Sequence, residues 1–181
     1  MARIVLITGG SRSGKSSFAE KMACELSESR LYVATCPVTD PEMEKRIERH
    51  RRERQGMGWL TEECQQDIVS VLKSRADVEV VLLDCLTLWV NNLMYRAEKV
   101  GDTVTEEQVE KEIELLGATC RQRLGTVIFV TNEVGLGIVP ENRQARLYRD
   151  LVGRCNQCMA GEADEVYLVT CAIPLQIKGD R

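Results

Sequence analysis

The most constraining feature of the chain is the octapeptide at residues 9–16, which reads GGSRSGKS and matches the pattern G-x-x-x-x-G-K-[ST] in full. It directly follows the apolar run at 4–8, and residues 16–24 have helix-compatible spacing, with Phe18 and Met22 one turn apart. A strand, a glycine-rich turn and a helix in this order surround a phosphate with backbone N–H groups and a helix N-terminus. The chain is therefore predicted to bind a nucleotide.

The residue types of this phosphate loop (residues 9–16) have chemical reasons. Glycines lack a Cβ, so the backbone can approach anionic phosphates closely. The Lys15 ammonium reaches the β- and γ-phosphates, and the Ser16 hydroxyl can take one coordination position on Mg²⁺. We therefore expect Mg²⁺ as a cofactor. The expected nucleotide contacts in the loop are Gly9, Gly10, Ser11, Arg12, Ser13, Gly14, Lys15 and Ser16.

The fold class follows from apolar, β-branched runs that alternate with helix-patterned segments. Continuous apolar strands alternating with helices predict an α/β fold, a mostly parallel sheet with helices on both faces. Asp40 before Pro41 signals one helix start, and the capping box at 105–108 opens a second helix. The expected strands are 4–8, 31–35, 78–83, 127–131 and 166–170, with a short edge strand at 174–177. The apolar stripe of the second helix is Val109, Ile113, Leu116, Cys120 and Leu124.

Size and charge limit the function classes. The 181 residues, 44 % hydrophobic and 29 % charged, predict one domain over 1–181. A net charge of -4 gives no general attraction to nucleic acid or anionic lipid, and no segment approaches the roughly 20 apolar residues of a membrane span. We expect a cytoplasmic small-molecule enzyme with reduced cysteines. Cys155 and Cys158 form the one C-x-x-C pair, which lacks further zinc ligands.

Asp84 ends the apolar run at 80–83 and is the candidate second metal-site residue. A carboxylate in this position lies at the carboxyl edge of the sheet beside the phosphate loop, where it can hold Mg²⁺ directly or through water. The alternative is an ordinary aspartate that starts a turn.

The only histidine, His50, shares a helix face with Met43 and Ile47. One interpretation is a packed or surface histidine beside a solvated charge run. The other is catalytic: neighbouring guanidinium groups disfavour the imidazolium, and a neutral imidazole nitrogen is a nucleophile toward phosphorus. The flanking arginines, which could bind phosphates, are Arg46, Arg49, Arg51, Arg52 and Arg54.

Several motifs together carry a family resemblance. They are TGGSRSGKS at 8–16, YVAT at 32–35, the RIxxH pattern at 46–50, LLDCLT at 82–87, VTNEVGLGIVPENR at 130–143 and RDLVGRCNQ at 149–157. Almost end to end, the chain resembles the bifunctional adenosylcobinamide kinase / adenosylcobinamide-phosphate guanylyltransferase family of cobalamin assembly. The resemblance implies a P-loop NTPase of RecA-like fold.

The resemblance implies two reactions, with ATP and GTP as substrates. The first phosphorylates the aminopropanol hydroxyl of adenosylcobinamide. The second transfers GMP from GTP to that phosphate and gives adenosylcobinamide-GDP and pyrophosphate. His50 matches the family's guanylylated histidine, and Lys15 and Arg12 would neutralise charge as pyrophosphate leaves. The implied assembly is a homotrimer.

The resemblance also implies nucleotide contacts outside the phosphate loop. They are Ala34, Thr35, Cys36, Arg51, Arg52, Glu53, Arg54, Glu63 and Asp84. The family pattern R-P-x-x-W is replaced here by RQGMGW at 54–59, and the extra residue leaves the choice between Glu62 and Glu63 open. Asn132, Glu133 and the loop with Gly135 and Gly137 are expected either to bind the corrinoid or to pack against a neighbouring subunit.

Two other functions compete with this interpretation. One is a RecA-like, ATP-driven module that reports its nucleotide state to a protein partner. The other is a kinase that has lost nucleotidyl transfer. A histidine adduct with GMP would separate both from the bifunctional enzyme.

Overall fold

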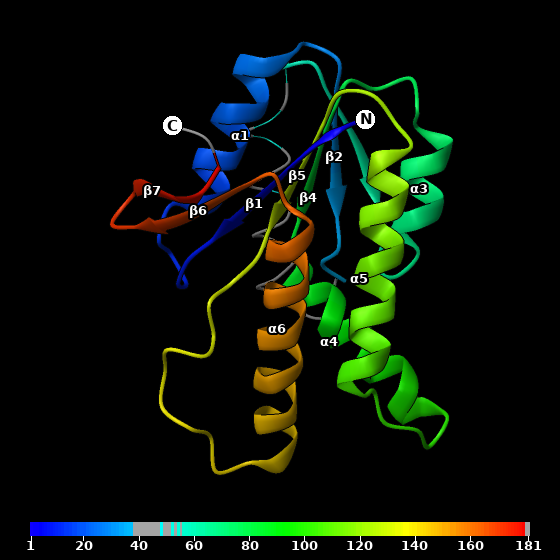
Figure 1. Cartoon of the computed structure of the whole chain (residues 1–181), viewed down its shortest axis with the longest axis vertical. Coiled ribbons are helices and arrows are strands. Elements are labelled where there is room, and N and C mark those ends of the chain that lie inside the picture. Colours follow the sequence, from blue (N-terminus) through cyan, green and yellow to red (C-terminus); the bar gives the residue numbers. More distant parts are fainter. Residues whose placement is uncertain (38–47, 49–51, 53, 55, 180–181) are drawn as a thin grey trace.

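The computed structural model describes residues 1–37, 48, 52, 54 and 56–179. These residues form a seven-stranded sheet with the order β3-β2-β4-β5-β1-β6-β7 (Figure 1). The strands are β1 (Arg3–Thr8), β2 (Arg30–Ala34), β3 (Trp59–Glu63), β4 (Val80–Asp84), β5 (Thr126–Val130), β6 (Glu165–Thr170) and β7 (Ile173–Lys178). All neighbours pair in parallel except β6 and β7, which form an antiparallel hairpin.

Helices cover both faces of the sheet, as the sequence predicts. They are α1 (Lys15–Leu26), α3 (Ile68–Ser74), α4 (Leu86–Lys99), α5 (Glu106–Arg121) and α6 (Arg143–Glu162). α1 lies on one face, and α3, α4, α5 and α6 lie on the other (Figure 1). Alternate residues of each strand enter different cores: Leu6 packs in the layer of the four helices, whereas Val5 and Ile7 pack in the layer of α1. Burial on both faces explains why the central strands read as continuous apolar runs.

The sequence pattern missed one strand. β3 is a half-exposed edge strand of sequence WLTEE that pairs with β2. Its polar sequence carries no apolar run, and backbone pairing with a buried neighbour makes it a strand. The edge strand expected at 174–177 is present as β7, which is two residues longer.

The predicted capping box opens α5. The Gln108 backbone N–H donates to the Thr105 hydroxyl at 3.3 Å, and the Thr105 N–H donates to the Gln108 side chain at 2.8 Å. Four residues of the predicted stripe are buried, but the fifth, Leu124, is 79 % exposed. α5 ends at Arg121, so Leu124 lies beyond the helix and off its inner face. The helix start expected at Asp40 lies outside the described residues.

Part of the molecule extends past the carboxyl edge of the sheet. Figure 1 shows α4, the first turns of α6 and the yellow segment before α6 reaching well below the strand ends. In the part of the chain that the structure describes, no helix is long and apolar enough to cross a membrane.

Candidate nucleotide site at the carboxyl edge of the sheet

The phosphate loop connects β1 to α1, as predicted. Gly14 is the N-cap of α1 and has φ 94°, a left-handed conformation that glycine adopts without strain. A Cβ at Gly14 would lie 2.9 Å from the Cα of Ala172, in the β6–β7 turn. The Ala172 N–H also donates to the Ser13 carbonyl at 2.8 Å. The C-terminal hairpin therefore supports the loop from behind.

Lys15 is buried, and its ammonium donates to the Gly10 carbonyl at 3.0 Å. The Ser13 N–H donates to the same carbonyl at 3.2 Å, so the loop is curled over its lysine. Ser11 and Arg12 are exposed, whereas Ser16 is half-buried in the first turn of α1. The lysine and the hydroxyl predicted to serve the phosphates thus lie in one compact turn at a helix N-terminus.

Asp84 ends β4 at the same edge of the sheet. The strand register places it opposite Ala34 of β2 and Val130 of β5. Beyond β5, the Thr131 N–H donates to the Ile7 carbonyl and the Glu133 N–H donates to the Gly9 carbonyl, both at 3.0 Å. The strand ends therefore bring 34–35, 84 and 131–133 to one edge with the phosphate loop, which is where ligands of such sheets bind.

Buried hydrogen bonds fix the segments that follow these strands. The Thr35 hydroxyl donates to the Cys85 carbonyl and accepts from the Cys85 N–H, both at 2.8 Å. The Asn132 amide donates to the Thr87 hydroxyl at 3.0 Å. From α6, the Asn156 amide donates to the Asn132 carbonyl, also at 3.0 Å. Two of the expected binding residues, Thr35 and Asn132, therefore also hold the edge of the sheet together.

Tyr32 was not predicted as a site residue, yet it contacts one. Its hydroxyl donates to Oδ2 of Asp84 at 3.1 Å. The guanidinium of Arg54 lies 3.5 Å from the centre of the tyrosine ring and pairs with Glu20 of α1 at 3.3 Å. Burial, and next the charge of Asp84, raise the pKa of Tyr32, so the phenol stays protonated as a donor. A polar hydroxyl between the apolar residues Leu31 and Val33 of β2 was the available sequence signal.

Glu63 and Glu62 lie on opposite faces of β3. Glu63 pairs in register with Ala34, which packs on the α1 side of the sheet. Glu62 instead forms an ion pair with Arg75 at 3.7 Å. The register therefore places Glu63, and not Glu62, on the face that carries α1 and the phosphate loop.

Three of the predicted site residues, His50, Arg51 and Glu53, lie outside the described residues. Arg52 is exposed and pairs with Glu48 at 3.0 Å, whereas Arg54 is only 6 % exposed. Cys36 is half-buried just after β2.

The oxygen donors Ser16 and Asp84 suit Mg²⁺. This ion is usually held by one or two protein groups together with substrate phosphates, not by a cage of protein ligands. The described residues contain no cluster of three or more His, Cys, Asp or Glu that could hold a metal. Cys155 is buried in α6 and Cys158 half-buried, and burial raises the pKa of both thiols. Both are free cysteines.

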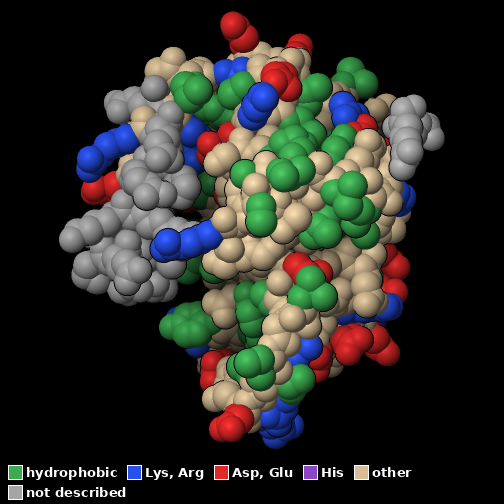
Figure 2. Space-filling model, turned by 90° about the vertical axis from the view of Figure 1, so that its left-hand side faces the viewer, with side chains coloured by type: hydrophobic (Ala, Val, Ile, Leu, Met, Phe, Trp, Pro, Cys, Tyr) green, Lys and Arg blue, Asp and Glu red, His purple; other side chains and the backbone are tan. Residues whose placement is uncertain are grey.

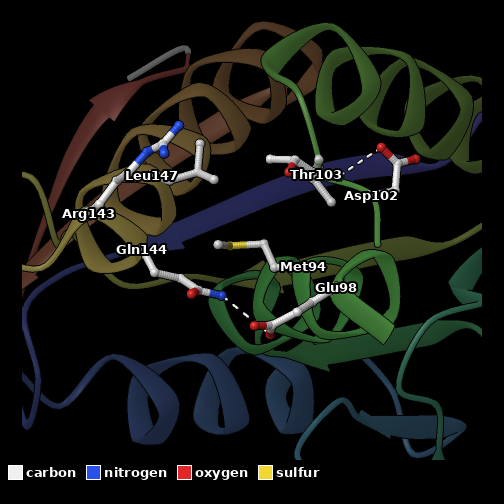
Figure 3. A pocket seen from close by; sticks show the side chains of 8 residues that line it. Met94, Glu98, Asp102, Thr103, Arg143, Gln144 and Leu147 are labelled. Atoms are coloured by element: carbon white, nitrogen blue, oxygen red, sulfur yellow. Dashed lines mark hydrogen bonds between the residues drawn. The ribbon is translucent and has the colours of Figure 1, made fainter. Parts of the chain in front are cut away.

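A cavity of about 280 Å³ lies in the part that extends beyond the sheet (Figure 3). It is lined by Met94, Glu98, Asp102, Thr103, Val104, Arg143, Gln144 and Leu147. The Gln144 amide donates to Glu98 across it at 3.3 Å. None of the lining residues was predicted to belong to the nucleotide site.

Comparison with solved structures identifies the fold. The chain is similar to the flagellar accessory protein FlaH from Methanocaldococcus jannaschii, with a TM-score of 0.55 and 13 % identity over 98 % of this chain and 79 % of that one. It is also similar to the RadB recombinase, with a TM-score of 0.52 and 14 % identity over 92 % and 73 %. These likenesses confirm the RecA-like P-loop fold.

Three curated relatives match almost the whole chain. The bifunctional adenosylcobalamin biosynthesis protein CobU is 44 % identical over 184 residues in Escherichia coli and 40 % over 182 in Salmonella typhimurium, in each case covering 97 % of this chain and 99 % of the relative. CobP of Pseudomonas aeruginosa, also a bifunctional adenosylcobalamin biosynthesis protein, is 35 % identical and covers 97 % of both chains. The family model described as cobinamide kinase / cobinamide phosphate guanyltransferase matches residues 5–177, from β1 to β7. Since that match contains the phosphate loop and every strand end that meets it, the chain belongs to this family.

Proposed function

We propose that the chain phosphorylates adenosylcobinamide with ATP or GTP and then transfers GMP from GTP to adenosylcobinamide phosphate. The products of the second reaction are adenosylcobinamide-GDP and pyrophosphate, in the assembly of the cobalamin nucleotide loop. The observation that carries this proposal is the family match over 5–177 together with an intact phosphate loop.

In the kinase reaction, the corrinoid hydroxyl oxygen attacks the γ-phosphorus and the bond to the β-phosphate oxygen breaks. Such a transfer depends on positioning and charge stabilisation. The N–H groups of the phosphate loop and the Lys15 ammonium would hold the β- and γ-phosphates. Ser16 and Asp84 would hold Mg²⁺, which supplies positive charge to the phosphate oxygens when bound.

In the guanylyl reaction, the imidazole of His50 attacks the α-phosphorus of GTP. A P–N bond forms, pyrophosphate leaves, and the ring loses its N–H proton. An oxygen of adenosylcobinamide phosphate then attacks the same phosphorus and breaks the P–N bond, which frees the imidazole to take a proton again. GTP and adenosylcobinamide phosphate are both anions. The covalent adduct replaces one direct transfer between them with two successive displacements.

The anchoring of Arg54 supports a role for His50 at this edge. Arg54 contacts Tyr32 of β2, whose hydroxyl donates to Asp84, and Glu20 in the second turn of α1, the helix that follows the phosphate loop. His50 precedes Arg54 by four residues, and four residues of extended chain span at most about 14 Å, a separation that supports this role.

Labelling with α-³²P GTP tests the proposal. We expect an acid-labile, alkali-stable GMP adduct on the wild type and none on His50→Ala, while His50→Ala retains cobinamide kinase activity. Labelling that survives the substitution would remove His50 from the mechanism. ATP hydrolysis that responds to a protein or DNA but not to cobinamide would favour the partner-reporting module instead.

We also propose that the enzyme is a cytoplasmic homotrimer. Two strips of exposed apolar residues support an assembly. One is Leu136, Ile138 and Val139 in the segment before α6, and the other is Ile173, Leu175 and Ile177 on β7. β7 and the segment before α6 lie on the left-hand side of Figure 1, and Figure 2 views the molecule from that side. Hydrophobic side chains gather there in several patches. Exposed apolar patches commonly mark protein contacts. Sedimentation equilibrium should give three times the 20.4 kDa chain mass.

A further inference from the structure

We infer that Tyr32 is a positioning residue that joins the proposed metal carboxylate Asp84 to Arg54, which follows His50 by four residues in the sequence. Its hydroxyl orients the carboxylate, and its ring holds Arg54. The inference rests on the proposed function, because it assigns the two ends of one side chain to the metal site and to the guanylyl step.

The tyrosine is rigidly placed. It lies in the middle of β2, which pairs with the edge strand β3 on one side and with β4 on the other, and is 6 % exposed. The Trp59 ring packs edge-on against it, with ring centres 6.1 Å apart and planes at 84°. With its backbone paired on both sides and its ring enclosed, the side chain has little freedom to change rotamer. Groups that contact it are therefore held in fixed positions.

The hydroxyl acts on Asp84. It donates to Oδ2 at 3.1 Å, and the described residues offer no hydrogen bond to Oδ1. A donor on one carboxylate oxygen restricts the rotation of the group and leaves the second oxygen available to a metal ion. Partners of this kind orient metal ligands, and their loss commonly costs about 10- to 100-fold in metal affinity or activity.

The ring acts on Arg54. The guanidinium lies flat enough over the ring to bring its carbon within 3.5 Å of the centre, and its other partner is the carboxylate of Glu20 at 3.3 Å. Arg54 is buried, and its Nε has no hydrogen-bond partner in the described structure. A buried cation needs compensation, which among the described residues comes from the aromatic face and the ion pair with Glu20. Arg54 is thus held against β2 and α1.

The two contacts can be separated by substitution. Tyr32→Phe removes the hydrogen bond to Asp84 and keeps the ring under Arg54. Glu20→Gln weakens the hold on Arg54 and leaves Asp84 and its donor in place. Tyr167→Phe is the matched control, because Tyr167 also lies on the α1 side of the sheet and donates to a carboxylate, Glu165 at 2.7 Å, away from Asp84.

The first measurement is the affinity for Mn²⁺ in the presence of a non-hydrolysable GTP analogue. Electron paramagnetic resonance detects the bound ion. We expect Tyr32→Phe to weaken Mn²⁺ binding by about 10-fold, in line with the loss of a partner that orients a metal ligand. Glu20→Gln and Tyr167→Phe should stay within about 2-fold of the wild type, because both leave the donor on Asp84 intact. Wild-type Mn²⁺ affinity in Tyr32→Phe, or an equal loss in Tyr167→Phe, would overturn the metal half of the inference.

The second measurement is the rate of GMP adduct formation at saturating Mg²⁺. Glu20→Gln should slow it at least about 5-fold, whereas excess Mg²⁺ should restore Tyr32→Phe to near the wild-type rate, since its ring still holds Arg54. Tyr32→Leu removes both the ring and the hydroxyl, so it should both weaken Mn²⁺ binding and slow adduct formation at saturating Mg²⁺. Wild-type adduct formation in Glu20→Gln and Tyr32→Leu would overturn the second half. Thermal unfolding monitors folding of each variant. If even the wild type forms no adduct, the proposed function fails, while the Mn²⁺ measurement still decides the role of the hydroxyl.

Discussion

The phosphate loop and the segment at 131–142 both leave the carboxyl edge of the sheet, but they are supported in opposite ways. The base of the loop is enclosed, because Lys15 is buried and Gly14 packs against the β6–β7 turn. The segment is anchored on either side of its middle, where the Glu133 N–H donates to the Gly9 carbonyl at 3.0 Å and Arg146 donates to the Pro140 carbonyl at 2.9 Å. Between them, Leu136 is 85 % and Ile138 95 % exposed.

The difference reflects what each region has to contact. Phosphates are small and of fixed geometry, so a loop that binds them gains from being preorganised by the fold. An exposed apolar segment gains only when another surface covers it. We therefore expect substitutions in the loop to abolish chemistry without changing assembly, and substitutions in the segment to do the reverse.

The largest effect is expected for Lys15→Met. Because we propose that the ammonium neutralises phosphate charge in both reactions, the substitution should lower kinase and adduct-forming rates by about 10² to 10³. The trimer should persist, since the residue is buried within the phosphate loop turn. Steady-state kinetics and sedimentation of the same sample check both points. A trimer that falls apart in Lys15→Met would contradict the proposed separation of the two regions.

An intermediate effect is expected for the double variant Leu136→Ser, Ile138→Ser. Both side chains are almost fully exposed in the single chain, so each change should alter its free energy of unfolding by no more than about 0.5 kcal/mol. Assembly should weaken, because the substitutions remove apolar area that a neighbouring chain would bury. Light scattering over a concentration series measures this. If the trimer is unaffected while cobinamide affinity falls, the segment binds the corrinoid instead.

The smallest effect concerns the opposite, amino edge of the sheet and depends on pH. Hydrogen bonds from Arg3 are the main cause that lowers the pKa of Glu165, and bonds from Arg121 do the same for Asp164. A carboxylate whose pKa is lower in the folded state stabilises the fold above its unfolded pKa, near 4, and loses this contribution as the pH falls through the folded value.

We therefore expect the free energy of urea unfolding to decrease from pH 6 to pH 3, with a smaller decrease in Glu165→Gln. The difference should be under about 1 kcal/mol, because the ion pair is partly solvated. An identical pH dependence in both proteins would exclude a contribution from Glu165.

Much of the fold could be predicted because local chemistry specifies it. The runs around Ile4, Val81 and Val127 could only be buried strands, and Thr105 with Gln108 could only open a helix. β3 and the exposure of Leu124 could not be predicted, because the first depends on pairing with β2 and the second on where α5 stops.

The same division applies to the site. The phosphate loop and Asp84 could be named as candidates because phosphate and Mg²⁺ favour those residue types after a strand, whatever surrounds them. The support of Gly14 by Ala172 and the contacts of Tyr32 with Asp84 and Arg54 were not, since these partners are 22 or more residues apart in the chain. The sequence by itself determined the chemistry at the strand ends, because that chemistry is local. Only the tertiary structure decided which distant side chains orient it, because strand order and register bring them together.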